Sequence, residues 1–500
     1  MGEQTVVRTA RGAVRGRTEG GVTAFLGIPF AAPPLGALRF QAPQPAAPWD
    51  GVREADAFGP PPPQAPLGPQ PPAPEPVRHD PGDWLTLNVW TPDPGAAGLP
   101  VLVWVYGGAY RMGSSAEPGY RGSVLAGHGA VVVTANHRVG VEGYAQLDGA
   151  PANRGLLDVV AVLRWVREEI AAFGGDPANV TVFGESAGAG AVAALMVMPA
   201  AEGLFDRVIA QSVPATCFTP ALARDVSAEI VAPLGLAPSA AALADVDPQR
   251  LVDALGELDR RMPAIERWGL VAHTPTPFSP VVDGEVLPTD PWTGLAAGAA
   301  RDVPLVVGHT RDEWRLFLVM GGQSVTDEMA AGAMRVFGPE PDPEERMRAA
   351  FPGASAEELF VLACSDRMFR MPSVHLAEAH TAGGGRSHLY ELTWPTPALG
   401  GVFGACHALD VPLVFGVSDE GLPLQLVGSP PPDDAREVSA QMQAAWTGFA
   451  RDGDPGWTPY DARQLTRVFD VGERGGVRPY PEEASWKLWA DRPPEVVDLR

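Results

Sequence analysis

The chain has 500 residues, of which 45% are hydrophobic and 19% are charged. Such a chain can bury a large core, so disorder over its whole length is excluded. Its net charge is −23, from 37 basic and 60 acidic residues. This balance disfavours nucleic acid and anionic membrane surfaces as partners, because both bind clustered Lys and Arg. We find neither a run of roughly 18 apolar residues, which a membrane span needs, nor a secretory signal pattern in MGEQTVVRTARG.

The three cysteines, Cys217, Cys364 and Cys406, are far apart in the sequence and odd in number. This usage disfavours a disulfide framework and a metal site with cysteine ligands. We therefore expect a reduced, cytoplasmic protein.

Short apolar runs alternate with helical periodicity in the first half of the chain. The runs VLVWV (101–105), VVVTA (131–135) and VTVF (180–183) are each followed by a turn with Gly, Asn or Ser, as buried parallel strands are. Between the last two, apolar residues recur at helical spacing over 156–173, and Gly174 and Gly175 end that helix. Two further strands are expected at 303–307 and 388–392. The pattern predicts an α/β fold.

Three segments interrupt this alternation. The stretches 218–270 and 322–385 are Ala-rich and helical in character, and we expect helical insertions that form a cap over the sheet. The segment 59–77, GPPPPQAPLGPQPPAPEPV, is too rich in proline for a helix or a central strand. We expect a semi-extended surface loop there, and the alternative is a rim or lid beside a pocket. No linker divides the chain, so one domain over 1–500 is predicted.

The strongest functional motif is Gly184-Glu185-Ser186-Ala187-Gly188, which follows the strand TVF and precedes a helix over 189–198. A G-x-S-x-G sequence between strand and helix is a nucleophile elbow. The turn is so tight that side chains at Gly184 and Gly188 would clash with neighbouring backbone, and the serine itself is strained. The rival interpretation is a glycine-rich phosphate loop. That pattern would begin only at Gly188, inside the helix, and no P-loop lysine follows it.

A second glycine-rich turn, Tyr106-Gly107-Gly108-Ala109-Tyr110, directly follows the strand VLVWV. Its glycines allow backbone N–H groups to point into a site. Together with the N–H of Ala187, these groups would form an oxyanion hole. An ordinary glycine turn is the alternative, and the neighbouring elbow disfavours it.

A serine nucleophile needs a base, and the base needs an orienting acid, in the chain order Ser, acid, His. Six histidines follow Ser186: His273, His309, His375, His380, His388 and His407. Asp312 and Glu313 follow the strand VPLVV and are the acid candidates, and spacing alone does not choose between them. His273 and His309 precede this pair. The segment HLAEAH (375–380) has neither the order nor the spacing of a zinc motif.

Among the histidines that follow the acid candidates, His388 begins an expected strand, whereas His407 follows a loop after a strand. His407 is therefore the predicted base.

At this point the chain resembles the type B carboxylesterases, the carboxylesterase and cholinesterase branch of the α/β-hydrolases, and is similar to bacterial para-nitrobenzyl esterases. The resemblance covers most of the chain. Besides the elbow, it rests on the ordered motifs 25–40, 49–53, 87–92, 173–181, 280–284, 311–313 and 414–416.

The resemblance implies an α/β-hydrolase fold with a central, mostly parallel sheet, flanking helices and helical cap insertions. It places the nucleophile on Ser186, the base on His407 and the acid on Glu313. The oxyanion donors fall on the backbone N–H groups of Gly108, Ala109 and Ala187. The implied activity is hydrolysis of small-molecule carboxylic esters through an acyl-enzyme. No metal or cofactor is needed, and we expect a monomer or small homo-oligomer.

Two alternatives remain open. An amidase or carbamate hydrolase would use the same triad, and only the pocket would differ. A non-catalytic interaction protein on the same fold is disfavoured, since all three catalytic positions are present. An organophosphate labels an activated serine, so labelling would distinguish an esterase from a non-catalytic interaction protein.

The chain also departs from the family pattern. A disulfide common in the family would join the positions of Pro62 and Trp84 here, and a usual glutamate and glutamine are replaced by Gly82 and Val159. These changes leave the predicted chemistry intact.

Three side chains near the triad have two interpretations each. Glu185 is either a carboxylate that tunes the site or favours cationic groups, or a buried glutamate satisfied by hydrogen bonds. Trp314 and Phe317 either line the pocket or pack in the core.

Overall fold

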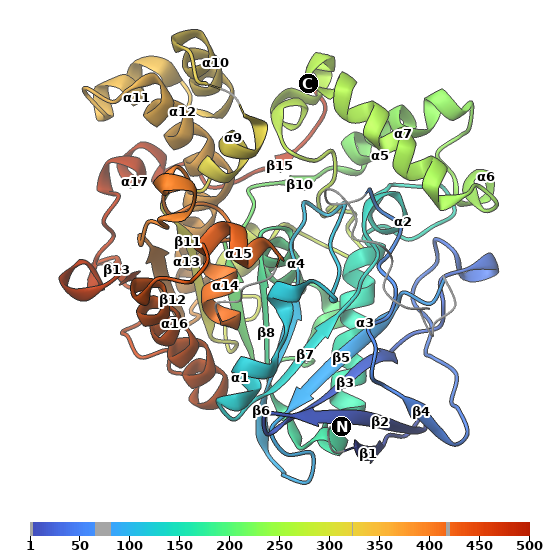
Figure 1. The fold of residues 1–500 in the computed structure, drawn as a ribbon. Coiled ribbons are helices and arrows are strands. Elements are labelled where there is room, and N and C mark those ends of the chain that lie inside the picture. Colours follow the sequence, from blue (N-terminus) through green and yellow to red (C-terminus); the bar gives the residue numbers. More distant parts are fainter. Residues whose placement is uncertain (1–3, 66–81, 323, 417–420) are drawn as a thin grey trace.

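The fold is built on one large sheet, shown by a computed structural model that describes residues 4–65, 82–322, 324–416 and 421–500 (Figure 1). In spatial order its strands are β1 (Gln4–Arg8), β2 (Ala13–Glu19), β3 (Val22–Pro29), β5 (Thr86–Thr91), β7 (Val131–Ala135), β6 (Leu99–Val105), β8 (Gly175–Glu185), β9 (Arg207–Gln211), β11 (Leu305–Thr310), β12 (Ser387–Leu392), β13 (Leu465–Phe469) and β14 (Gly476–Pro479), with β4 (Val52–Glu54) beside β2. The strands from β7 to β13 are parallel, and the outer pairs are antiparallel, except that β4 runs parallel to β2. The predicted mostly parallel sheet is therefore present.

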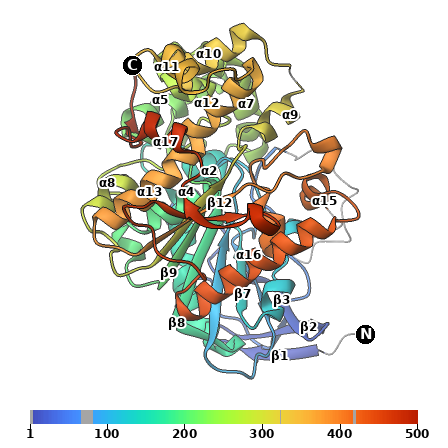
Figure 2. The same ribbon diagram turned by 90° about the vertical axis from the view of Figure 1, so that its left-hand side faces the viewer.

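Alternate residues of the central strands face two different hydrophobic layers. Val101 and Val103 of β6 pack with α3 (Arg154–Glu169), α4 (Ala187–Leu195) and α13 (Met371–Ala382). Leu102 and Trp104 pack with α1 (Ser123–Gly127), α14 (Asp410–Phe415) and α16 (Asp433–Asp452) on the other face. Figures 1 and 2 show the helices on both sides of the sheet. Continuous apolar strands follow from this double burial.

The expected elements are confirmed with small shifts at their ends. The helix expected over 156–173 is α3, extended by a 3-10 turn, η3 (Ile170–Phe173), and Gly174 ends it with φ of 88°. The strand expected at 303–307 begins only at Leu305 and runs to Thr310, because the preceding Pro304 has no N–H for the ladder.

Helices from two distant parts of the chain form two lobes at one end of the sheet (Figure 1). One lobe holds α5 (Pro220–Val231), α6 (Ala240–Leu243) and α7 (Pro248–Arg261). The other holds α9 (Arg315–Gly321), α10 (Asp327–Phe337), α11 (Pro343–Ala350) and α12 (Ala356–Ser365). The stretch 322–385 also contains α13, which packs on β11 and β12 in the core. A two-stranded sheet of β10 (Cys217–Phe218) and β15 (Val496–Val497) lies between the lobes.

The other α-helices of the described residues lie outside these lobes: α2 (Gly140–Tyr144), α8 (Pro291–Ala296), α15 (Gly421–Val427) and α17 (Glu483–Trp489). No helix within the described ranges is long and apolar enough to cross a bilayer. Cys217, Cys364 and Cys406 are all buried free thiols.

Of the proline-rich segment 59–77, residues 66–77 lie outside the described residues. In the described part, Gly59 and Pro62 are buried. Gln64 donates to the carbonyl of Gly113 at 2.9 Å and accepts from its N–H at 2.8 Å. This part of the segment is therefore docked on the loop that follows β6, without a covalent link.

Candidate active site

Ser186 lies at the sharp turn between β8 and α4, with φ of 57° and ψ of −125°. A Cβ added at Gly188 would overlap the carbonyl oxygen of Val105, and one added at Gly184 would lie 2.7 Å from the same oxygen. Only glycine fits at either position, which is the steric reason that the sequence motif suggested. The strained serine is held out at the start of α4, whose N-terminus favours developing negative charge.

The loop after β6 approaches the same turn. A Cβ on Gly107 would lie 3.0 Å from the Cβ of Ser186, so a glycine is needed for this close approach. Gly108 and Ala109 have φ of 107° and 57°. Among the described residues, no hydrogen-bond acceptor is found for the N–H groups of Gly108, Ala109 and Ala187. Three free donors beside a strained serine are what an oxyanion requires.

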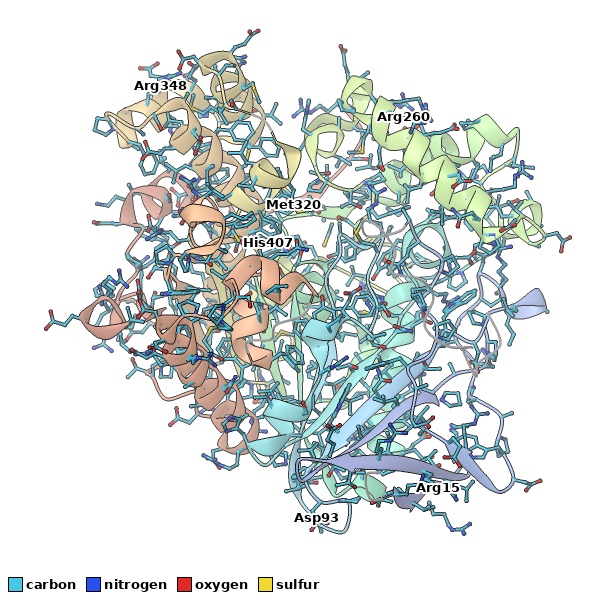
Figure 3. The ribbon with its side chains drawn as sticks, in the orientation of Figure 1. Arg15, Asp93, Arg260, Met320, Arg348 and His407 are labelled. Carbon is cyan, nitrogen blue, oxygen red and sulfur yellow. The ribbon has the colours of Figure 1, made fainter. Side chains whose placement is uncertain are left out.

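His407 lies between Ser186 and Glu313. Its Nε2 is 2.8 Å from the Ser186 Oγ, and its Nδ1 is 2.5 Å from the Glu313 Oε2. With Glu313 ionised, Nδ1 carries the proton and donates a hydrogen bond to the carboxylate. Nε2 is then the acceptor for the serine hydroxyl. Figure 3 shows His407 in the middle of the molecule, below the two helical lobes whose ends are marked by Arg348 and Arg260.

Glu313 is completely buried and is held from two more sides. Its Oε1 accepts from the Ser212 hydroxyl at 2.6 Å and from the Thr310 N–H at 2.9 Å. Burial raises the pKa of Glu313, but the charge and hydrogen bond of His407, with the Ser212 bond, outweigh burial and hold this pKa below its ordinary value. The carboxylate therefore stays ionised.

The neighbouring carboxylate, Asp312, points elsewhere. Its Oδ2 accepts from the Ala405 N–H at 2.9 Å and pairs with Arg311 at 3.0 Å. These contacts lie in the loop before His407, and of the two carboxylates only Glu313 has a hydrogen bond to the imidazole.

The other downstream histidines make no hydrogen bond with Ser186 or Glu313 among the described residues. His309 contacts Tyr480, His375 contacts Glu378, and His380 contacts Ser387. His388 is buried beside Trp457. His273 belongs to η7 (Glu266–His273) in the helical insertion.

Glu185 reaches the same imidazole as Ser186. Its Oε1 is 3.1 Å from the His407 Nε2 and has no hydrogen-bond donor in the described structure. Burial raises the pKa of Glu185. For His407 burial lowers the pKa, but the carboxylates of Glu185 and Glu313 outweigh burial, so the pKa is raised. This contact favours the interpretation of Glu185 as a carboxylate that tunes the site.

The pKa shift of His407 predicts the pH dependence. Because Nε2 accepts a proton only when His407 is neutral, we expect the acid limb of kcat/KM to lie above about pH 6.5, the ordinary value for histidine. Glu185→Gln removes a negative charge that favours the imidazolium, so the midpoint should fall by roughly one pH unit. Glu169→Gln, at a buried carboxylate that bonds Ala10, is the control and should leave the midpoint unchanged. A Glu185→Gln midpoint equal to or above that of the wild type would contradict this assignment.

Aromatic rings cover the imidazole of His407 on the side of the lobe that holds α9 to α12. The ring of Phe369 lies 4.3 Å from that of His407, and Phe317 lies 5.3 Å away. Trp314 packs against Phe317 at 4.7 Å but is buried and has no ring contact with His407. Of the two aromatics considered from the sequence, Phe317 therefore lies at the site and Trp314 supports it. In the view of Figure 3, Met320 of α9 lies above His407, and this residue is 73% exposed.

Three of the four positions that depart from the family pattern are buried. Trp84 and Val159 are buried in the main core, and a Cβ on Gly82 would contact Leu35. Pro62 is buried as well. Among the described residues, none of these positions has a hydrogen bond with Ser186, His407 or Glu313.

Comparisons with known proteins identify the family. Residues 3–336 match the Carboxylesterase family. Para-nitrobenzyl esterase of Bacillus subtilis (strain 168) is 37% identical over 465 residues, which cover 90% of each chain. Fumonisin B1 esterase of Sphingopyxis macrogoltabida is 35% identical and covers 96% of this chain and 89% of its own. The chain belongs to the carboxylesterase family.

A solved structure of a PNB esterase superposes on this carboxylesterase with a TM-score of 0.84 at 35% identity, over 97% of this chain and 99% of its own. The predicted α/β-hydrolase fold is therefore confirmed, and so is the predicted activity class, a serine carboxylesterase acting on small-molecule carboxylic esters. The described residues contain no cluster of His, Cys, Asp or Glu that could hold a metal ion.

Proposed function

We propose that this carboxylesterase cleaves esters with Ser186 as nucleophile, His407 as general base and acid, and Glu313 as the residue that orients His407. The observation that carries the proposal is the unbroken chain of short contacts from the Ser186 Oγ through His407 to the buried Glu313. The strained turn at Ser186 and the free N–H groups beside it support the same assignment.

Acylation begins when the Ser186 Oγ attacks the ester carbonyl carbon while the His407 Nε2 takes the hydroxyl proton. The carbonyl oxygen becomes an oxyanion and accepts hydrogen bonds from the N–H groups of Gly108, Ala109 and Ala187. The intermediate collapses, and His407 gives its proton to the leaving alcohol. The product of this half is an acyl ester on Ser186.

Deacylation repeats these steps with water as the nucleophile. His407 takes a proton from the attacking water, the same N–H groups hold the oxyanion, and His407 returns the proton to the Ser186 oxygen as the acid leaves. Throughout, Glu313 keeps the proton of neutral His407 on Nδ1 and stabilises the imidazolium. Apart from the ester and one water molecule, these steps use only groups of the chain itself.

We also propose the setting in which the enzyme acts. It is a bacterial, cytoplasmic monomer or small homo-oligomer, with no nucleic-acid or membrane partner. The bacterial relatives, the buried free thiols and the net charge of −23 support this proposal.

Phe369 and Phe317 favour esters with an apolar acyl or alcohol group, because both rings flank the reacting imidazole. We expect the rates with p-nitrophenyl esters of increasing acyl length to pass through an optimum. Phe369→Ala removes a ring beside His407. It should raise kcat/KM for longer acyl chains, relative to that for the wild-type optimum, by about tenfold, which is the size of a one-methylene effect in such a pocket.

Two controls accompany that series. Phe337→Ala removes a ring that contacts Trp314 at 5.8 Å without reaching His407, and it should keep the wild-type optimum. A matched p-nitroanilide series separates ester from amide hydrolysis. If Phe369→Ala and the wild type had the same chain-length profile, Phe369 would not line the acyl pocket. If the enzyme cleaved the anilides faster than the esters, it would be an amidase rather than an esterase.

A further inference from the structure

The loop that presents the oxyanion donors is strained over consecutive residues. Gly108, Ala109 and Tyr110 all have positive φ, of 107°, 57° and 58°. Ala109 and Tyr110 carry a Cβ that disfavours this conformation. Such strain persists only where surrounding contacts fix the backbone. The contacts that fix this loop therefore set where its N–H groups point.

Local hydrogen bonds fix part of the loop. The N–H groups of Arg111 and Met112 both donate to the Gly108 carbonyl, at 3.0 and 3.1 Å, and the Tyr110 carbonyl accepts from Gly140 of α2 at 2.8 Å. These bonds tie the loop to itself and to its neighbour. They do not connect it to the helical lobe above.

The side chain of Arg111 makes that connection. Its Nη1 and Nη2 donate to the two carboxylate oxygens of Asp259 on α7, at 2.8 and 2.5 Å. The Arg111 side chain is only 12% exposed and that of Asp259 is 35% exposed. Two parallel bonds between planar groups fix orientation as well as distance, which a single contact does not. Nη1 also approaches the Pro275 carbonyl at 3.4 Å.

Packing does not fill the space beside this ion pair. A small cavity lies between the loop and α7, lined by Arg111 and Met112 on one side and Leu251 and Leu255 on the other. Leu251 and Leu255 precede Asp259 at spacings of four residues, so all three lie on the same face of α7. The ion pair is therefore a direct polar link between α7 and the loop, beside a gap in their packing.

We propose that Arg111 and Asp259 are positioning residues, through which cap helix α7 fixes the oxyanion loop in its strained, donor-presenting conformation. The proposal rests on the oxyanion role given above for Gly108 and Ala109. An oxyanion exists only after nucleophilic attack. A loosened loop therefore reduces the stabilisation of the transition state more than it reduces the affinity for the substrate. Loss of a whole donor costs roughly 100- to 1000-fold in rate, and a displaced donor costs part of that.

The test is a double-mutant cycle with Arg111→Met and Asp259→Asn. Methionine keeps much of the arginine stem, and asparagine matches the size of aspartate. We expect each single variant to lower kcat for a p-nitrophenyl ester about tenfold while KM changes less than about threefold. Because both residues act through one ion pair, the double variant should be no slower than the slower single variant.

Two further measurements separate positioning from mere stabilisation. A trifluoromethyl ketone forms a tetrahedral adduct with the serine, and its affinity should fall by the same factor as kcat/KM in each variant. Arg224→Met, at a second bidentate pair that joins Asp148 to α5, is the matched control and should leave kcat and ketone affinity unchanged.

The proposal is overturned if kcat stays within about twofold of the wild type in both single variants, or if the two losses multiply in the double variant. An unchanged ketone affinity beside a lowered kcat would also overturn it. Failure of the triad assignment would look different, because Ser186→Ala would then keep the wild-type rate.

Discussion

Ser186→Ala should lower kcat for a short p-nitrophenyl ester on the order of 10⁶-fold, and His407→Ala should cost about as much. The reason is geometric: the Ser186 Oγ and the His407 Nε2 are 2.8 Å apart and act in the same proton transfer. Removing either group removes the whole pathway, so the double variant should be no slower than either single one. Initial rates at saturating ester measure this directly.

Residual activity defines the control for that experiment. The oxyanion donors are present in both variants, so hydrolysis should still be about 10³- to 10⁴-fold faster than the reaction in water. Far-ultraviolet circular dichroism should match the wild type, since the backbone groups of Ser186 and His407 keep their hydrogen bonds. A folded Ser186→Ala protein that retains a tenth of the wild-type kcat would exclude the proposed nucleophile.

Glu313→Gln should lower kcat/KM by about 10⁴-fold, the loss seen when an orienting carboxylate of a serine hydrolase becomes an amide. Glu313 accepts from His407 at 2.5 Å and from Ser212 at 2.6 Å. Glutamine has nearly the same shape, but its amide group can hold the wrong imidazole tautomer and cannot stabilise the imidazolium. The comparison of kcat/KM at the optimal pH of each protein measures the loss.

Asp312→Asn is the matched control, because it neutralises the adjacent carboxylate on the same turn. Asp312 accepts from the Ala405 N–H and pairs with Arg311, so its replacement should cost less than about tenfold through the loop before His407. If Asp312→Asn were the more damaging change, the roles of the two residues would have to be exchanged.

The sequence was sufficient to predict the parts of the fold and the site that depend on local sterics. Gly184 and Gly188 are required because a Cβ at either position would clash with the carbonyl of Val105, and this constraint is readable as G-x-S-x-G. The buried strands at the centre of the sheet were equally readable, because burial on both faces requires continuous apolar runs.

Contacts between distant segments were not predictable in the same way. Glu313 was chosen over Asp312 by family resemblance, since spacing does not show which carboxylate turns toward His407. Ser212 lies 101 residues before the glutamate it contacts, and its only local sign is a φ of 58°, which a sequence does not display. A longer motif that included the end of β9 would be needed to find it.

Phe369 and the Arg111–Asp259 pair were missed for the same reason. Phe369 lies in a π-helical turn between α12 and α13, η8 (Asp366–Arg370). Such irregular turns often mark functional sites, yet the residues read as ordinary helix. Arg111 and Asp259 are 148 residues apart, and each alone resembles a solvated surface charge.

The electrostatics around His407 also depend on the folded structure. Glu185 and Glu313 are both buried within hydrogen-bond distance of the imidazole, on its Nε2 and Nδ1 sides. A buried imidazole alone would have a lowered pKa, and two carboxylates reverse that direction. We therefore expect Glu185, the neighbour of the nucleophile in the sequence, to help to set the pH range in which the base is active.

The most direct test of the central claim is active-site titration with a fluorophosphonate that carries a reporter group. We expect one label for each wild-type chain, on Ser186, with loss of esterase activity in proportion to labelling, and no label on Ser186→Ala. His407→Ala should be labelled far more slowly, because its serine has no base. Labelling of a residue other than Ser186 with parallel loss of activity, or rapid labelling without His407, would contradict the account.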